Sequence, residues 1–291
     1  MAVTITELLP ARAAAAAKAL APAGAKGGGA VQELTRAEGL TYTQASRQRT
    51  AAPLPRHYAG VVLYALLTAA TLWRHRALLT GAAAAAAPGA AACQLLAGLA
   101  LGWAAADFST GALHILLDHP RVRAWPRPIG GIATDFQVHH HFPRLLCTSH
   151  WLVQLNFPML CGIIVTAATL APRWAPASPA PLAALLAFGL GGSVSNLSHR
   201  WAHMLPAELP RPAAAAQAAG LLVSRAAHLR HHAGAHDRSF CILCGWCNGL
   251  LDAVYPWVAP SDAGQARAAA LLAACLASPF AVMWAAHSPR G

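Results

Sequence analysis

Residues 221–248, LLVSRAAHLRHHAGAHDRSFCILCGWCN, carry the histidine motif around which the predicted fold is organised. His228, His231 and His232 form H-x-x-H-H, and His236 follows four residues later. Because residues three and four apart share one face of a helix, the three imidazoles of the motif can converge on one point. Neutral imidazole binds iron, zinc and copper, so the motif predicts half of a metal site. For this motif alone, the alternative is a positively charged surface turn.

The composition indicates an integral membrane protein. Of the 291 residues, 56% are hydrophobic and only 11% are charged, against roughly 25% charged residues in soluble domains. The net charge of +11 comes from basic residues that flank apolar runs. This arrangement favours an anionic membrane surface, rather than nucleic acid, as the partner. The 7 cysteines show no secreted disulfide pattern and are expected to be reduced thiols.

The apolar segments predict an all-α fold, a helical bundle of about four membrane spans. The expected spans cover 58–73 (extendable through 79), 82–117, 151–170 and 181–197, and a span needs roughly 20 residues. A last apolar run at 266–286 contains Pro279 and is the least certain, with an interfacial or re-entrant helix as the alternative to a span. Residues 56–291 are expected to form one membrane domain.

Four spans place all the histidine motifs on one side of the membrane. Of the 21 Lys and Arg residues, 16 fall on that same side. By the positive-inside rule, the histidine-rich face is expected to look into cytosol or stroma. The first 55 residues are rich in Ala, Gly and basic residues, and two interpretations stay open for them: an organelle transit peptide or a low-complexity tail.

Eight histidines are expected on this face. The H-x-x-H-H motif supplies three of them, the i, i+4 pair in 199–203 and the tandem pair in 139–140 supply two each, and the last one is four residues before Asp118. The eight are His114, His139, His140, His199, His203, His228, His231 and His232. Eight nitrogens suffice for two metal ions at about four ligands each. The chain has no H-E-x-x-H and no G-x-S-x-G motif, which disfavours a zinc metalloprotease or a serine hydrolase. The pattern predicts a non-haem diiron site that activates O2.

Five motifs in order resemble the Kua / plasmanylethanolamine desaturase family, and most of all its plant branch, the plastid fatty acid desaturase 4 type. They are DFSTGALH (107–114), FQVHHHFP (136–143), SNLSHRWAH (195–203), GLLVSR-x-x-H-x-x-HH (220–232) and FCILCGWCNGLLD (240–252). The resemblance implies a membrane desaturase with two Fe ions that uses O2 and two electrons. It would place a trans-3 double bond in palmitate on phosphatidylglycerol in a chloroplast membrane, with ferredoxin or cytochrome b5 as the electron donor. The animal branch of the family makes the vinyl ether of plasmalogens, and for that branch the endoplasmic reticulum is the expected location.

The resemblance also assigns roles to residues of this chain. All eight histidines fall on family histidines and are expected to be metal ligands. Asp107 and Asp118 match acidic positions and are expected to orient imidazole N–H groups. Asn248 is expected to position a ligand or a water molecule. Four further histidines stay outside the assigned set, and Ile115 stands where the family has an aromatic residue. These four are His119, His141, His150 and His236.

Three alternatives remain open from the residues. Cys241, Cys244 and Cys247 form C-x-x-C-x-x-C, which is able to ligate zinc or an iron–sulfur cluster but lacks a clear fourth ligand. A diiron lipid hydroxylase begins with the same C–H cleavage as a desaturase. A non-catalytic metal-binding membrane protein would need only one ion. For the substrate, eight arginines on the histidine-rich face favour an anionic head group. They are Arg121, Arg123, Arg127, Arg144, Arg200, Arg225, Arg230 and Arg238.

Overall fold

The computed structural model describes residues 53–84, 88–172, 175–176, 178–258 and 261–287. All regular secondary structure in these ranges is helical, which confirms the predicted all-α class. Nearly all of the predicted tail, residues 1–52, lies outside the described residues. The choice between a transit peptide and a low-complexity tail therefore stays a prediction.

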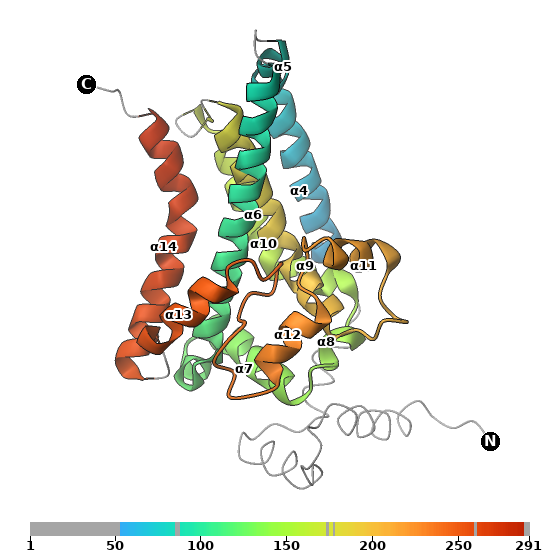
Figure 1. The fold of residues 1–291 in the computed structure, drawn as a ribbon, viewed down its shortest axis with the longest axis vertical. Helices are drawn as coiled ribbons and strands as arrows, with labels where there is room; N and C mark the ends of the chain where they lie inside the picture. Colours follow the sequence, from blue (N-terminus) through green and yellow to red (C-terminus); the bar gives the residue numbers. More distant parts are fainter. Residues whose placement is uncertain (1–52, 85–87, 173–174, 177, 259–260, 288–291) are drawn as a thin grey trace, which may run out of the picture.

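Five long helices form the body of the fold (Figure 1). They are α4 (Pro55–Arg74), α6 (Pro88–Asp118), α9 (Trp151–Ala168), α10 (Pro179–His203) and α14 (Asp262–His287). Helices α6 and α10 make the central pair; α9 packs on α10, α4 packs on α9, and α14 packs on α6. The short helix α5 (Arg76–Ala84) connects α4 to α6.

Two of these helices are long and apolar enough to cross a membrane, Gly89–Asp118 and Pro179–His203. They correspond to two of the four predicted spans. The other two predicted spans fold as the helices α4 and α9, and the run at 266–286 lies within the continuous helix α14. Helix α4 buries little of its own surface and exposes large apolar side chains, such as Leu66 at 63% and Trp73 at 70%. The count of four spans and the side that the histidines face remain predictions.

Two glycines one helical turn apart let α6 and α10 touch backbone to backbone. A Cβ atom on Gly98 would lie 2.3 Å from the carbonyl oxygen of Ala180, and one on Gly102 would lie 2.0 Å from that of Ala184. No other residue fits at these contacts. Such small-residue faces are a common device of membrane helix pairs. The contact fixes how the carboxyl ends of the two helices align, and this end carries the predicted metal ligands.

Short helices surround the carboxyl ends of α6 and α10 (Figure 1). They are η1 (Pro120–Ala124), α7 (Ile129–His141), α8 (Leu145–Thr148), α11 (Arg211–Ala218), α12 (Arg225–His232) and α13 (Asn248–Val258). Side chains from α6, the 240–248 loop and α13 form a buried apolar cluster that includes Leu117, Phe240 and Leu251. This cluster packs the carboxyl end of α6, which carries His114 and Asp118, against α13.

Candidate metal centre

Asp118 and the eight predicted histidines converge at the carboxyl ends of α6 and α10, in two groups. The five-histidine group consists of His139, His199, His203, His228 and His232. The four-ligand group consists of His114, Asp118, His140 and His231. Within each group the potential ligand atoms all lie within 4.8 Å of one another. Residues from four helices, separated by more than a hundred positions in sequence, thus meet at one place.

Helix periodicity explains how each helix contributes. The pairs His114 and Asp118 on α6, and His199 and His203 on α10, are four residues apart, so each pair serves a single group. His139 and His140 are adjacent on α7, and adjacent helical residues point about 100° apart. They therefore enter different groups, and α12 likewise contributes to both. Helices α7 and α12 link the two groups.

The spacing of the nitrogens fits one cation in each group. In the five-histidine group, Nε2 of His203 lies 3.2 Å from Nε2 of His199 and 3.0 Å from Nε2 of His228. In the four-ligand group, Nε2 of His231 lies 3.2 Å from Nε2 of His140. With metal–nitrogen bonds of about 2.0–2.1 Å, neighbouring ligands of a tetrahedral or octahedral ion are about 2.8–3.4 Å apart. The observed distances fall in this range.

Buried polar atoms without hydrogen-bond partners give a second reason to place a cation here. Both carboxylate oxygens of Asp118 and Nε2 of His139 are buried and accept or donate no hydrogen bond. The Asp118 carboxylate lies 3.4 Å from Nε2 of His114, His140 and His231. Burying an unpaired carboxylate is costly. A metal ion between these atoms removes that cost, so the residues present fit a metal centre.

Backbone carbonyls orient three of the imidazoles. Nδ1 of His114 donates to the Phe240 carbonyl oxygen at 2.8 Å, and Nδ1 of His231 donates to that of Arg238 at 2.8 Å. Nδ1 of His139 donates to the carbonyl oxygen one turn earlier on α7. Because a carbonyl oxygen only accepts, each Nδ1 carries the proton and each Nε2 keeps a lone pair for a metal.

Burial keeps His139, His140 and His228 neutral. It lowers the pKa of His139, His140 and His228 well below the ordinary histidine value, and the neighbouring imidazoles lower it further. Neutral imidazole is the form that binds a metal. The centre is therefore ready to coordinate at neutral pH without first losing protons.

The family model for the lipid desaturase domain matches residues 103–260, which is more than half of the chain. The chain belongs to the lipid desaturase domain family. The matched segment contains all nine residues of the two metal-binding groups. Helices α4 and α14 lie entirely outside it.

Two kinds of curated relatives are similar to this member of the lipid desaturase domain family. Fatty acid desaturase 4, chloroplastic, of Arabidopsis thaliana is 30% identical over 157 residues, which cover 54% of this chain and 47% of the relative. Plasmanylethanolamine desaturase 1 of Mus musculus is 27% identical over 172 residues, which cover 55% and 61%. The chain thus spans about half the length of the Arabidopsis relatives it matches. No solved structure matches it.

Asp107 supports the metal-binding groups indirectly, through a loop, and does not orient an imidazole directly as expected from the sequence. Its buried carboxylate accepts hydrogen bonds from three backbone N–H groups of the 240–248 loop instead of contacting an imidazole. The donors, at 2.8–3.0 Å, are Cys244, Gly245 and Cys247. The physical reason is position: Asp107 precedes His114 by two turns of α6. The loop that it holds carries the carbonyl of Phe240, which orients His114.

Asn248 acts on the same loop. Its Oδ1 accepts a hydrogen bond from the backbone N–H of Cys241 at 2.8 Å. It begins α13, so it ties the loop to that helix. The predicted role of positioning a ligand or a water molecule stays a prediction. Asp118, expected to orient imidazoles, instead lies with its carboxylate among the ligand atoms of the four-ligand group.

The three cysteines of the C-x-x-C-x-x-C motif do not join a metal-binding group among the described residues. Burial and the neighbouring Asp107 carboxylate raise the pKa of all three thiols, that of Cys247 to about 11. Only a thiolate is a good metal ligand. In the fold, Cys241 packs in the buried apolar cluster, and Sγ of Cys247 donates to the Ala104 carbonyl oxygen at 3.3 Å.

The remaining histidines of the region have other positions. His119 connects the end of α6 to the turn before α14, through Nε2 and the Ser261 carbonyl oxygen at 3.2 Å. His150 caps the first turn of α9. His236 belongs to neither group, yet its ring stacks on that of His140 with centroids 4.1 Å apart. His236 follows His232 by four residues, but α12 ends at His232 and His236 has a positive φ of 55°, so loop packing and not a helical face brings it to the site.

Proposed function

We propose that the chain is a membrane lipid desaturase with a non-haem diiron centre. The reaction removes two hydrogen atoms from adjacent CH2 groups: –CH2–CH2– + O2 + 2 e⁻ + 2 H⁺ → –CH=CH– + 2 H2O. The observation that carries this proposal is the pair of adjacent nitrogen-rich groups at the ends of two long apolar helices. A single structural ion would leave four or five of these buried ligands unused. Membership of the lipid desaturase domain family supports the same reaction class.

Eight histidines and Asp118 would hold the two ions, and bound iron would supply the O2 chemistry that breaks an unactivated C–H bond. The protein supplies the geometry. Carbonyl contacts fix the tautomers of His114 and His231. Burial of the ligand side chains excludes bulk water from the reacting atoms; His114 and His231, for example, are 0% exposed.

For the substrate, we propose palmitate on phosphatidylglycerol, with the double bond at carbon 3 in the trans configuration. The metal-binding groups lie at the ends of α6 and α10, so a lipid whose glycerol stays at the interface would present carbons near its carboxyl end. The named chloroplastic relatives support a plastid membrane, and ferredoxin as the electron donor. The arginine argument is weaker than the sequence suggested, because at least six of the eight arginines are engaged within the protein. These six are Arg121, Arg123, Arg144, Arg200, Arg225 and Arg238.

A second candidate is the formation of a vinyl ether on a plasmanyl lipid, with cytochrome b5 as the electron donor in the endoplasmic reticulum. The mouse relative, a plasmanylethanolamine desaturase, supports it. Both reactions act close to the glycerol backbone, so the same depth of the metal centre suits either. A diiron lipid hydroxylase would insert oxygen after the same C–H cleavage, and its product is distinguished by mass.

The test is reconstitution of the iron-loaded protein in liposomes with a reduced electron donor. Palmitoyl phosphatidylglycerol and a plasmanyl ethanolamine lipid are offered separately, each with ferredoxin and then with cytochrome b5. We expect two irons per chain and trans-3-hexadecenoate on phosphatidylglycerol. His139→Ala should remove activity, whereas His150→Ala, at the start of α9, should retain it. One zinc per chain, with neither lipid altered, would contradict an enzymatic function. A vinyl ether as the product would replace the substrate assignment and leave the desaturase in place.

A further inference from the structure

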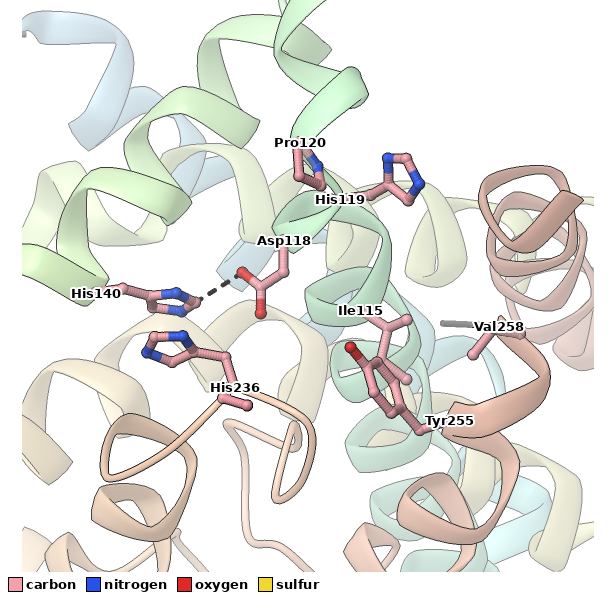
Figure 2. A pocket seen from close by; sticks show the side chains of 9 residues that line it. Ile115, Asp118, His119, Pro120, His140, His236, Tyr255 and Val258 are labelled. Carbon is pink, nitrogen blue, oxygen red and sulfur yellow. Dashed lines mark ion pairs between the residues drawn. The ribbon is translucent and has the colours of Figure 1, made fainter. Parts of the chain in front are cut away.

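A cavity of about 220 Å³ lies directly against the four-ligand group (Figure 2). Asp118 and His140, two members of that group, form part of its wall. None of its lining residues belongs to the five-histidine group. A molecule in this cavity therefore lies beside the four-ligand group, and the five-histidine group is screened from it.

The wall of the cavity has two chemically different sides. Figure 2 shows His140 and His236 on one side, and Ile115, Tyr255 and Val258 on the other. Ile115 is 4% exposed and Val258 is 1% exposed, so packing fixes both side chains. An aliphatic and aromatic wall accepts methylene groups, while the polar side faces the metal ligands. This arrangement suits an alkyl chain that passes one or two carbons in front of the metal centre.

Helix α13, which forms the apolar wall, also has a surface that suits a membrane interface. Its outer face exposes Leu250 at 59% and Trp257 at 55%, while Leu251 and Val258 on its inner face are buried. Amphipathic helices with exposed Trp and Leu lie at the boundary of head groups and acyl chains. Trp257 and Val258 are neighbours, so the interface-facing and cavity-facing side chains are one residue apart.

A cation stands at the outer side of the same helix. The guanidinium of Arg267, on α14, lies over the ring of Trp257 at 5.2 Å and donates a hydrogen bond to the Trp257 carbonyl oxygen at 3.0 Å. Its side chain is exposed. A lipid phosphate at the interface would meet this positive charge while its acyl chain enters the cavity behind α13.

We propose that this cavity receives the carboxyl-proximal end of an acyl chain of a membrane glycerophospholipid, and that Val258 sets how far the chain enters. The proposal rests on the desaturase function proposed above. It makes the four-ligand group the one that faces the substrate. It also makes Val258, with Ile115 and Tyr255, a determinant of which carbon is oxidised.

A matched pair of variants tests the assignment. Val258→Phe fills this cavity; Met159→Phe fills a separate cavity of about 270 Å³ between α4 and α9, and none of the residues that line it belongs to either metal-binding group. With Val258→Phe we expect desaturation to fall about tenfold or more, because overpacking at a buried site blocks the chain, while both metals are retained. With Val258→Ala we expect the double bond to move further from the carboxyl end. Met159→Phe should keep the wild-type product and rate. Unchanged products in both Val258 variants, or loss of activity only in Met159→Phe, would overturn the proposal.

A binding measurement keeps the inference separate from the proposed function. Phosphatidylglycerol with a diazirine among the first few carbons of one acyl chain is photolysed with the metal-loaded protein in liposomes, and labelled peptides are identified by mass spectrometry. We expect labelling of the 251–258 peptide, lost in Val258→Phe and kept in Met159→Phe. If this labelling occurs while no lipid is desaturated, the cavity assignment holds and the desaturase proposal fails. Labelling confined to α4 and α9 would refute the cavity assignment, whatever the activity.

Discussion

Asp107→Asn is expected to destabilise the protein and loosen the four-ligand group together. The Asp107 carboxylate is 0% exposed and accepts three backbone hydrogen bonds, at 2.8, 3.0 and 3.0 Å. The asparagine amide keeps one acceptor oxygen, but its NH2 group faces the backbone N–H of Cys247 and cannot accept a hydrogen bond from it. Hydrogen bonds to a charged group contribute about 1.5–3 kcal/mol each. Losing one bond, and the charge in the other two, should lower the free energy of unfolding by about 2–4 kcal/mol.

The same substitution should reach the metal centre through the 240–248 loop. That loop holds the Phe240 carbonyl that orients His114, a member of the four-ligand group. Removing a supporting contact of a metal ligand typically weakens metal affinity about 10- to 100-fold. Asp107 acts through an additional element, so a loss of about tenfold is expected. The five-histidine group has no such contact with the loop and should keep its ion.

Two measurements check this reasoning, thermal unfolding in detergent micelles and iron content under chelator competition. The unfolding temperature should fall by roughly 5–15 °C, since 1 kcal/mol corresponds to about 2–4 °C for a domain of this size. About one of the two irons should become easier to remove. Asp237→Asn is the control, because that carboxylate is exposed and pairs only with the adjacent Arg238. An unfolding temperature equal to wild type would refute the hydrogen-bond argument, and equal loss of both irons would refute the link to one group.

Three further predictions follow from the packing and the ligand sets. His139→Ala and His231→Ala each remove a ligand from a different group, so each purified variant should contain about one metal instead of two, by elemental analysis. Gly102→Leu places a side chain 2.0 Å from an α10 carbonyl oxygen and should prevent stable assembly; Gly131→Ala, with nothing within 4 Å of the new Cβ, should unfold at or slightly above the wild-type temperature. Cys247, whose thiol pKa burial raises to about 11, should resist iodoacetamide at pH 8 in native protein, because about one thousandth is thiolate, and react once the protein is denatured.

The convergence of the histidines was predictable because helix geometry is regular; that they bind metal stays a prediction. An i, i+4 pair such as His199 and His203 shares a face wherever the helix packs, and the predicted set coincides with the histidines that converge. Their division between two groups was not predictable. The division depends on the angle at which α7 and α12 pack against α6 and α10. The adjacency of His139 and His140 in the sequence does not reveal that angle.

The contacts that support the ligands escape sequence reasoning for a different reason. Two of the orienting acceptors are backbone carbonyls, at Arg238 and Phe240, and every residue has a carbonyl. The 236–247 segment that presents them has no helical or strand period, and its shape depends on contacts with distant residues. Asp107 was recognised as important from its motif, but its partner, a loop about 140 residues away, became visible only in the fold.

The asymmetry of the two groups suggests a division of labour at the centre. The five-histidine group is all nitrogen, is enclosed by α7, α10 and α12, and has no contact with the cavity. The four-ligand group includes the Asp118 carboxylate, and both this carboxylate and His140 border the cavity. A carboxylate has two donor oxygens, so it can shift between them as coordination changes, whereas an imidazole presents a single nitrogen to a metal. The ligand with two donor atoms thus lies where substrate would approach, and the all-nitrogen group lies behind it. Because α7 and α12 supply ligands to both groups, the same two helices also hold the groups at a fixed separation.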